Sequence, residues 1–209
     1  MNLKQKIIII DYGVGNTHSV SNALFFLGYR HIKISANETD IKNADAIILP
    51  GVGAFDEAIK NLKARNLDIL LNEQVKTRKK PLLGICVGMQ LLAEGSEENG
   101  WHEGLGWISG KVKRLHLANQ FAVPHVGWNN VTSSVQKPLF MNTIPDGHYY
   151  FDHSYYFDCP EKNISAFFKY GIKIAAAVQH ENICGVQFHP EKSQTNGLRL
   201  FRSFLNSIS

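Results

Sequence analysis

The sequence predicts an α/β fold, with a mostly parallel central sheet flanked by helices and a β-rich second half. Two observations predict it. Short apolar, β-branched runs alternate with segments of helical periodicity up to about residue 92, and strand-like runs then follow one another from about Trp107 to Gln187. A chain of 209 residues, 44% hydrophobic and 19% charged, can also bury one core without disulfides. We therefore expect a single domain over residues 1–209.

The first half follows a strand–helix rhythm that is typical of a parallel sheet with helices on both faces. The runs are mostly apolar, as in strands buried on both sides. Gly28 ends the first expected helix. The expected strands are Lys6–Ile10, His31–Ser35, Ala44–Leu49 and Pro81–Ile85, and the expected helices are Thr17–Leu27, Asp56–Lys63 and Asp68–Thr77.

The second half changes to short strands punctuated by Gly, Pro and Asn, and it ends in an amphipathic helix. The expected strands are Ile108–Leu115, Val126–Val131, His148–Phe151, Ile164–Tyr170, Ile174–Gln179 and Ile183–Phe188. The last helix, Gly197–Ile208, carries Leu198, Phe201, Phe204, Leu205 and Ile208 on one face.

The charge balance is mildly basic. The 22 Lys and Arg residues exceed the 18 Asp and Glu residues by 4, and the excess is spread along the chain. The densest cluster, Lys76–Lys80, lies where a helix should end, so we interpret it as a solvated helix end and not as a nucleic-acid patch. We expect no nucleic-acid partner.

Cysteine usage and hydropathy bound the compartment. Cys86, Cys159 and Cys184 are too few and too scattered for a disulfide framework, and no pair has the spacing of metal ligands. The apolar run Ile7–Ile10 is shorter than the core of a signal peptide, and no stretch has the length of a membrane span. We expect a cytoplasmic protein with no cofactor, no metal and no membrane association.

The strongest sign of chemistry is the segment Gly84–Gly88, Gly-Ile-Cys-Val-Gly, between a buried strand and an apolar helix. It has the form of a nucleophile elbow with cysteine in place of serine. The glycines allow a sharp turn that presents Cys86 at a helix N-terminus, where the helix dipole favours a thiolate, and the Val87 N–H would face a developing oxyanion. The alternative is a buried structural cysteine.

A thiol nucleophile needs a base, and one of the nine histidines has a suitable setting. His189 follows the strand Ile183–Phe188, and Pro190 fixes the backbone after it. Glu191, two residues on, could orient the imidazole and stabilise its charge as the third member of a triad. The alternative is an ordinary histidine at a strand end beside a solvated glutamate.

A second oxyanion donor is expected in the glycine-rich turn Gly51–Gly53, where Val52 and Gly53 follow the strand Ala44–Leu49. In a doubly wound sheet this turn lies at the carboxyl edge beside the elbow, and its glycines permit backbone N–H groups to face an acyl group. A plain glycine-rich turn explains the same residues equally well.

Two other chemistries are excluded. Gly13-Val14-Gly15 follows the first strand, but His18 stands where a dinucleotide fingerprint has its third glycine, and no acidic residue ends the second strand. His102-Glu103 lacks the second histidine of the zinc-hydrolase pattern.

Taken together, Gly84–Gln90 and Gln187–Ser193 resemble the class I (triad) glutamine amidotransferases. More narrowly, four further segments are similar to the glutaminase subunits of imidazole glycerol phosphate synthases. The resemblance covers the chain from about residue 7 to the last helix and implies the class I glutamine amidotransferase fold. The four segments are Asp11–Asn16, Leu49–Phe55, Pro124–Asn129 and Tyr150–Tyr155.

The resemblance implies hydrolysis of glutamine to glutamate and ammonia, with Cys86 as nucleophile, His189 as general base and acid, and Glu191 orienting His189. It implies oxyanion donors at Val87 and in Val52–Gly53. It also implies substrate contacts from Gly51, Gln90, His153, Ser154 and Tyr155, and interface or gating positions at Asn16, Trp128, Asn129, Tyr150 and Lys192.

The implied partner is a (β/α)8-barrel cyclase subunit that forms a heterodimer with the glutaminase and uses its ammonia in histidine biosynthesis. Asp152 departs from the family pattern, which has a small apolar residue there. We weigh three alternatives: a paralogue that supplies ammonia to a sugar-modifying synthetase in surface-polysaccharide assembly, a non-catalytic scaffold, and a cysteine peptidase or thiol hydrolase on the same elbow. The intact Cys86, His189 and Glu191 disfavour the scaffold.

Overall fold

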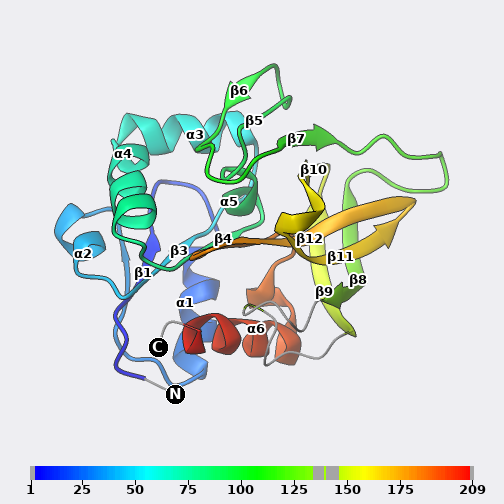
Figure 1. The fold of residues 1–209 in the computed structure, drawn as a ribbon. Coiled ribbons are helices and arrows are strands. Elements are labelled where there is room, and N and C mark those ends of the chain that lie inside the picture. The colour runs from blue at the N-terminus through cyan, green and yellow to red at the C-terminus, as the bar shows by residue number, and fades with distance from the viewer. Residues whose placement is uncertain (1–2, 134–138, 140–145, 208–209) are drawn as a thin grey trace.

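The computed structural model describes residues 3–133, 139 and 146–207, and a nine-stranded sheet forms its centre (Figure 1). The strand order is β2-β1-β3-β4-β13-β12-β11-β8-β9. The strands are β1 (Ile7–Ile10), β2 (Ile32–Ser35), β3 (Ala46–Leu49), β4 (Leu82–Ile85), β8 (His125–Ser133), β9 (Asp146–His153), β11 (Ile164–Tyr170), β12 (Ile172–His180) and β13 (Ile183–Val186).

One half of this sheet is parallel and the other antiparallel. β2, β1, β3, β4 and β13 pair in parallel, and β13, β12, β11, β8 and β9 pair in antiparallel fashion. Every residue of β1, β3, β4 and β13 is buried, because helices cover both faces of the parallel half. The predicted α/β class and the β-rich second half are confirmed.

The helices lie on the two faces of the parallel half: α1 and α6 lie together on one side, and α3 and α4 on the other (Figure 1). They are α1 (Thr17–Phe26), α2 (Glu38–Lys42), α3 (Phe55–Ala64), α4 (Leu67–Leu71), α5 (Val87–Gln90) and α6 (Gln194–Asn206). A π-helical turn (Asn72–Thr77) continues α4, and 3-10 turns cover Glu161–Asn163 and Pro190–Lys192. None of the helices described is long and apolar enough to cross a membrane.

A second sheet lies over the carboxyl edge of the parallel strands, with the order β10-β7-β5-β6 (Figure 1). Its strands are β5 (Gly95–Ser96), β6 (His102–Glu103), β7 (Lys111–Arg114) and β10 (Tyr155–Asp158). β10 follows β9 directly, so the chain passes from the large sheet to the small one at His153–Tyr155. This crossing places the segment 153–155 between the two sheets.

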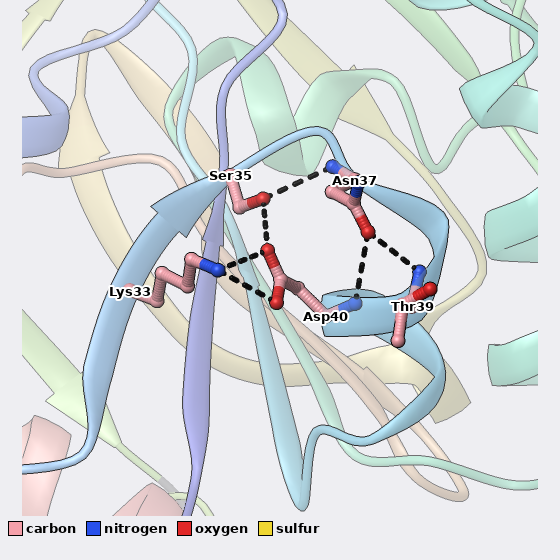
Figure 2. Close-up of polar contacts among 5 residues, drawn as sticks. All are labelled: Lys33, Ser35, Asn37, Thr39 and Asp40. Atoms are coloured by element: carbon pink, nitrogen blue, oxygen red, sulfur yellow. Dashed lines mark hydrogen bonds and ion pairs between the residues drawn. The ribbon is translucent and has the colours of Figure 1, made fainter.

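The elements predicted from the sequence are present, with shifted ends: α6, for example, begins at Gln194 and not at Gly197, and Ile208 lies outside the described residues. The sequence analysis missed β5, β6, β10 and α2. Helix α2 is only five residues long and depends on its N-cap, where the Asn37 Oδ1 accepts from the Thr39 N–H at 2.9 Å. Figure 2 shows this cap beside Asp40, which accepts hydrogen bonds from Lys33 and from the Ser35 hydroxyl.

Candidate active site

Three neighbouring parallel strands end at one place on the sheet, and the residues that follow them form the site. β3, β4 and β13 are adjacent in the sheet order. Pro50–Gly53 follows β3, Cys86 follows β4, and Gln187–His189 follows β13. Because the strands are parallel, these segments meet at the carboxyl edge, where α/β sheets bind ligands.

The nucleophile elbow predicted at Cys86 has the backbone that such a turn requires. Cys86 has φ 55° and ψ −111°, a conformation that costs a non-glycine residue strain energy. The Cys86 N–H donates to the Val186 carbonyl at 2.8 Å, which ties the turn to β13. A Cβ at Gly84 would lie 2.5 Å from the Gly88 carbonyl oxygen, and a Cβ at Gly88 would collide with the Leu49 carbonyl. Glycine is therefore needed at both positions, because a side chain at either one would collide with neighbouring backbone.

His189 and Glu191 are brought together by the 3-10 turn that begins at Pro190. The His189 Nδ1 lies 2.9 Å from the Glu191 Oε1, and both side chains are almost fully buried. The His189 N–H donates to the Tyr150 carbonyl at 2.9 Å, so β9 fixes the backbone of the histidine. A carboxylate on Nδ1 leaves Nε2 as the ring nitrogen that can exchange a proton with Cys86.

The charge state of His189 follows from its neighbours. Burial lowers its pKa, but hydrogen bonds with Cys86 and Glu191, together with their negative charges, outweigh burial and raise the pKa to about 10. The protonated ring is therefore favoured near pH 7. An imidazolium beside a cysteine sulfur is an arrangement that stabilises a thiolate.

Two more groups contact the elbow, the buried Gln187 side chain and the Asp152 backbone carbonyl. The Gln187 Nε2 lies 3.8 Å from the Cys86 Sγ, and the Asp152 carbonyl oxygen lies 4.0 Å from it. On the other side, the Tyr12 hydroxyl donates to the Pro50 carbonyl at 2.6 Å. Burial, and then the charge of Cys86, raise the pKa of Tyr12, so its phenol stays neutral and donates this bond.

A cavity of about 280 Å³ opens over the sulfur. It collects side chains from both sheets and from the turns between them, so the site is built where the small sheet covers the large one. The lining residues are Val52, Gly53, Cys86, Val87, Gln90, Glu98, Pro124, Asp152, His153, Ser154, Tyr155, His189 and Lys192.

Most residues expected to bind substrate lie on this cavity, but Gly51 does not line it. Gly51 lies beneath the elbow, where a Cβ would come within 2.7 Å of the Gly88 nitrogen and 2.8 Å of the Val87 Cβ. Val52 is 40% exposed, and Gly53 has φ +88°. Val87 begins helix α5, and the first N–H groups of a helix have no partner within it.

The residues expected at an interface divide into two groups. Trp128 and Tyr150, opposite each other on β8 and β9, contact edge to face with ring centroids 6.1 Å apart. The Lys192 Nζ lies 5.3 Å from the centre of the Tyr150 ring, and Lys192 also lines the cavity. Asn16 lies at the N-terminus of α1, and Asn129 contacts His125.

Comparisons with known proteins identify the family of the chain. A sequence model of the family "Glutamine amidotransferase class-I" matches residues 8–207. A protein named imidazole glycerol phosphate synthase subunit HisH 2, from Vibrio vulnificus strain YJ016, is 51% identical over 97% of this chain and 95% of its own length. HisH subunits from Listeria monocytogenes strain F2365 (48% identical, 97% of this chain, 96% of theirs) and Leptospira interrogans (44%, 94%, 97%) match similarly.

The chain belongs to the HisH family of class-I glutamine amidotransferases. As a member of this enzyme class, it shares its fold with structures of more distant sequence. A glutamine amidotransferase structure aligns with a TM-score of 0.75 at 20% identity, over 96% of this chain and 98% of that one. PurLQS from Thermotoga maritima aligns with a TM-score of 0.75 at 17% identity, over 99% and 100%.

In this HisH-family chain, sequence reasoning missed two side chains at the cavity and beneath it. Glu98 lines the cavity, and its Oε2 accepts from the Phe55 N–H at 2.9 Å. Burial, only partly offset by that bond, raises the pKa of Glu98. Gln187 is fully buried against the sulfur. No motif marks Glu98, because only the folding of the loop between β5 and β6 brings it to the site.

Over 3–133 and 146–207, no group of three or more His, Cys, Asp or Glu side chains is arranged to hold a metal ion. The three cysteines are unpaired thiols.

Proposed function

We propose that this chain is the glutaminase subunit of an imidazole glycerol phosphate synthase, releasing ammonia from glutamine for a (β/α)8-barrel cyclase bound as a heterodimer. The observation that carries the proposal is the cavity above Cys86, which His189 and Glu191 complete as a triad. Membership of the HisH family supports both the reaction and the pathway.

In the proposed reaction, the Cys86 thiolate attacks the side-chain amide carbon of glutamine. The carbonyl oxygen becomes an oxyanion, which the Val87 N–H and an N–H of Val52–Gly53 would hold. His189 then gives its proton to the leaving nitrogen, and ammonia departs from a thioester. Water attacks the thioester while His189 takes its proton, the C–S bond breaks, and glutamate leaves with the Cys86 thiolate and the His189 imidazolium restored. Glu191 holds the ring and its charge throughout.

The ends of the substrate would be bound by the far side of the cavity. A free amino acid carries an ammonium and a carboxylate, and the cavity offers groups of both signs. Glu98 supplies an acceptor for the ammonium, whereas Ser154 and the N–H groups of the segment 153–155 supply donors for the carboxylate. Gln90 would add its amide oxygen as a second acceptor for the ammonium, because its Nε2 already donates to Tyr155 and Gln187.

The partner would dock on the surface formed by Trp128, Tyr150 and Lys192. Trp128 is 47% exposed and its neighbour Val126 is 56% exposed, so β8 presents large apolar side chains to solvent. Trp and Tyr are the residues that most often dominate binding energy at interfaces. Because Lys192 also lines the cavity, this surface adjoins the point where ammonia forms. We propose the cytoplasm as the location, where reducing conditions keep the three thiols free.

The test is glutamate release from glutamine by the purified chain, alone and with the cyclase of the same genome and its ribonucleotide ligand. Strong stimulation by the cyclase is the expected result. A stable chain that the cyclase does not stimulate would contradict the histidine-pathway assignment and favour a sugar-modifying synthetase as acceptor.

Cys86→Ala tests the chemistry within the same assay. We expect glutamine-dependent turnover of the complex to be lost and turnover on added ammonia to remain, because the variant removes only the nucleophile. Cys184→Ala is the matched control, since Cys184 is equally buried but lies within β13. Glutamine-dependent turnover by Cys86→Ala would show that the nucleophile is another group.

A further inference from the structure

A pair of buried histidines lies at the wall of the cavity: His153 lines it and His125 does not, and the proposed reaction uses neither ring. His125 and His153 are opposite each other at the paired ends of β8 and β9, and they are 4% and 5% exposed. The His125 Nδ1 lies 3.2 Å from the His153 Nε2. The His153 Nδ1 lies 2.9 Å from the Tyr155 carbonyl oxygen.

These contacts determine where the protons are. A carbonyl oxygen only accepts, so the His153 Nδ1 carries hydrogen, and in a neutral ring its Nε2 is then an acceptor. The His125 Nδ1 must therefore donate to it. This leaves the His125 Nε2 as an acceptor, and the Asn129 amide nitrogen lies 3.4 Å from it.

The orientation of the Asn129 amide also requires the His125 Nε2 to be a hydrogen-bond acceptor. Its Oδ1 accepts from the Asn130 N–H at 2.8 Å, and its Nδ2 faces the Lys169 carbonyl at 3.4 Å. A flipped amide would lose both bonds, so the group that faces His125 is an NH2 donor. The hydrogen bonds therefore run in one direction, from Asn129 to His125, from His125 to His153 and from His153 to the Tyr155 carbonyl. All three are satisfied only when both rings are neutral and protonated at Nδ1.

The surroundings keep both rings uncharged. His125 lies against the rings of Tyr170, Phe151 and Phe168, with centroids 4.0, 5.1 and 5.3 Å away. Burial lowers the pKa of His125 to about 4 and that of His153 to about 3.

The far end of the pair reaches the glutamine cavity. The Tyr155 carbonyl that accepts from His153 also accepts from the Gln90 Nε2 at 3.1 Å. The same Nε2 donates to the Gln187 Oε1 at 3.1 Å, and the Gln187 Nε2 faces the Cys86 sulfur. Because both hydrogens of the Gln90 amide are used, its oxygen is the atom that the residue can offer to a substrate donor.

We propose that His125 and His153 are positioning residues: a neutral, Nδ1-protonated pair, held by Asn129, that orients the Tyr155 carbonyl and through it the Gln90 amide for glutamine binding. The pair joins β8, whose outer surface carries Trp128, to the substrate end of the cavity. The part of this inference that concerns glutamine rests on the proposed function.

The first test is spectroscopic and independent of activity. In ¹⁵N-histidine NMR of the full chain near pH 7, His125 and His153 should both show the neutral Nδ1–H tautomer, with His125→Phe and His153→Phe used to assign the signals. Free imidazole side chains do not select this tautomer so strictly. An Nε2–H tautomer or an imidazolium at either position would overturn the proposal.

The second test is kinetic and uses the complex with the cyclase. His125→Phe keeps an aromatic ring in the cluster but leaves the His153 Nε2 buried without a donor. We expect the KM for glutamine to rise about tenfold, about 1.4 kcal/mol, with kcat within about twofold and ammonia-dependent turnover unchanged. His125→Asn retains a donor near Nδ1 and should restore most of the affinity.

Phe168→Leu is the matched control, because it trims the same aromatic cluster and removes no hydrogen bond. If His125→Phe leaves the KM unchanged, or changes it no more than Phe168→Leu does, the pair only packs and the positioning role is wrong. If the wild-type complex releases no glutamate while both rings show the Nδ1–H tautomer, the proposed glutaminase function fails and the hydrogen-bond assignment stands.

Discussion

Glu191 uses one of its two buried carboxylate oxygens. Oε1 contacts His189, whereas Oε2 has no hydrogen-bond partner among the described residues. A buried carboxylate is costly unless its charge is paired. The His189 imidazolium therefore stabilises Glu191 as much as Glu191 stabilises the imidazolium, and the two groups should be treated as a unit.

This coupling makes stability depend on pH. The pKa of His189 is raised from an ordinary value near 6.5 to about 10. A raised pKa contributes stability that is complete below pH 6.5 and is lost as the pH rises through 10. Glu191→Gln keeps an acceptor for Nδ1 but removes the charge, so its loss of unfolding free energy should be larger at pH 6 than at pH 10. Urea denaturation at the two pH values measures it.

The control for this prediction removes the titrating ring. In a His189→Asn background, Glu191→Gln should show no such difference between pH 6 and pH 10. A pH-independent effect in the wild-type background would mean that His189 is not charged in the folded protein.

Among single residues, the sequence could predict those whose neighbours in the chain form a known motif. Cys86 stands between two glycines, and His189 and Glu191 lie two residues apart. Their spacing in the sequence is therefore enough to predict them as candidate site residues. Glu98 and His125 could not be found in this way. Their positions depend on a loop folding over the cavity and on the register of β8 with β9, which no spacing in the chain encodes.

The elbow depends on close approach between elements as well as on its own turn. Its glycines allow β4 and α5 to pass within contact distance of each other and of the end of β3. In Gly84→Ala the new Cβ would lie 2.5 Å from the Gly88 carbonyl oxygen, and backbone cannot move aside as a flexible side chain can. We expect a loss of about 1–3 kcal/mol in unfolding free energy, as for an overpacked core, and a larger loss of glutaminase activity.

Gly100→Ala provides the comparison for Gly84→Ala. Gly100 has φ +104° but nothing lies within 4 Å of an added Cβ, so the substitution measures backbone strain without a clash. Equal effects of the two variants on unfolding in urea would show that the close packing at Gly84 contributes little.

Three of the four elements that the sequence analysis missed share a physical property. β5 and β6 have two residues each, and α2 has five, so none is long enough to show periodicity. Their stability comes from contacts elsewhere: α2 from the Asn37 cap, and β5 from pairing with β6 and β7. By contrast, the buried strands β1, β3 and β4 can be predicted because each is a continuous apolar run in the sequence.

For the molecule as a whole, the decisive prediction concerns the surface beside the cavity. Trp128→Ala removes a half-exposed side chain, so the isolated chain should keep its thermal stability. Binding to the cyclase should weaken by about 30-fold, about 2 kcal/mol, as for a dominant interface residue. Calorimetric titration of the two subunits measures it.

Trp101→Ala is the control for Trp128→Ala, because Trp101 is similarly exposed, at 54%, but lies beside β6 on the small sheet. Trp101→Ala should leave cyclase affinity unchanged. If Trp101→Ala weakens binding and Trp128→Ala does not, the partner docks over the small sheet instead.

That residues 1–209 form one amidotransferase domain stays a prediction, which limited proteolysis would test.

The strand order carries a consequence for synthesis of the chain. β4 ends at Ile85, yet one of its two neighbours in the sheet is β13, which begins at Ile183. Strands that pair across such a distance form late, because a long loop must close first. On the ribosome, Cys86 therefore emerges long before the strand that bonds its N–H and the histidine that would activate it. If Cys86 is the nucleophile, a nascent chain carries it without its partners, so hydrolysis can begin only after residues 183–191 have emerged and folded.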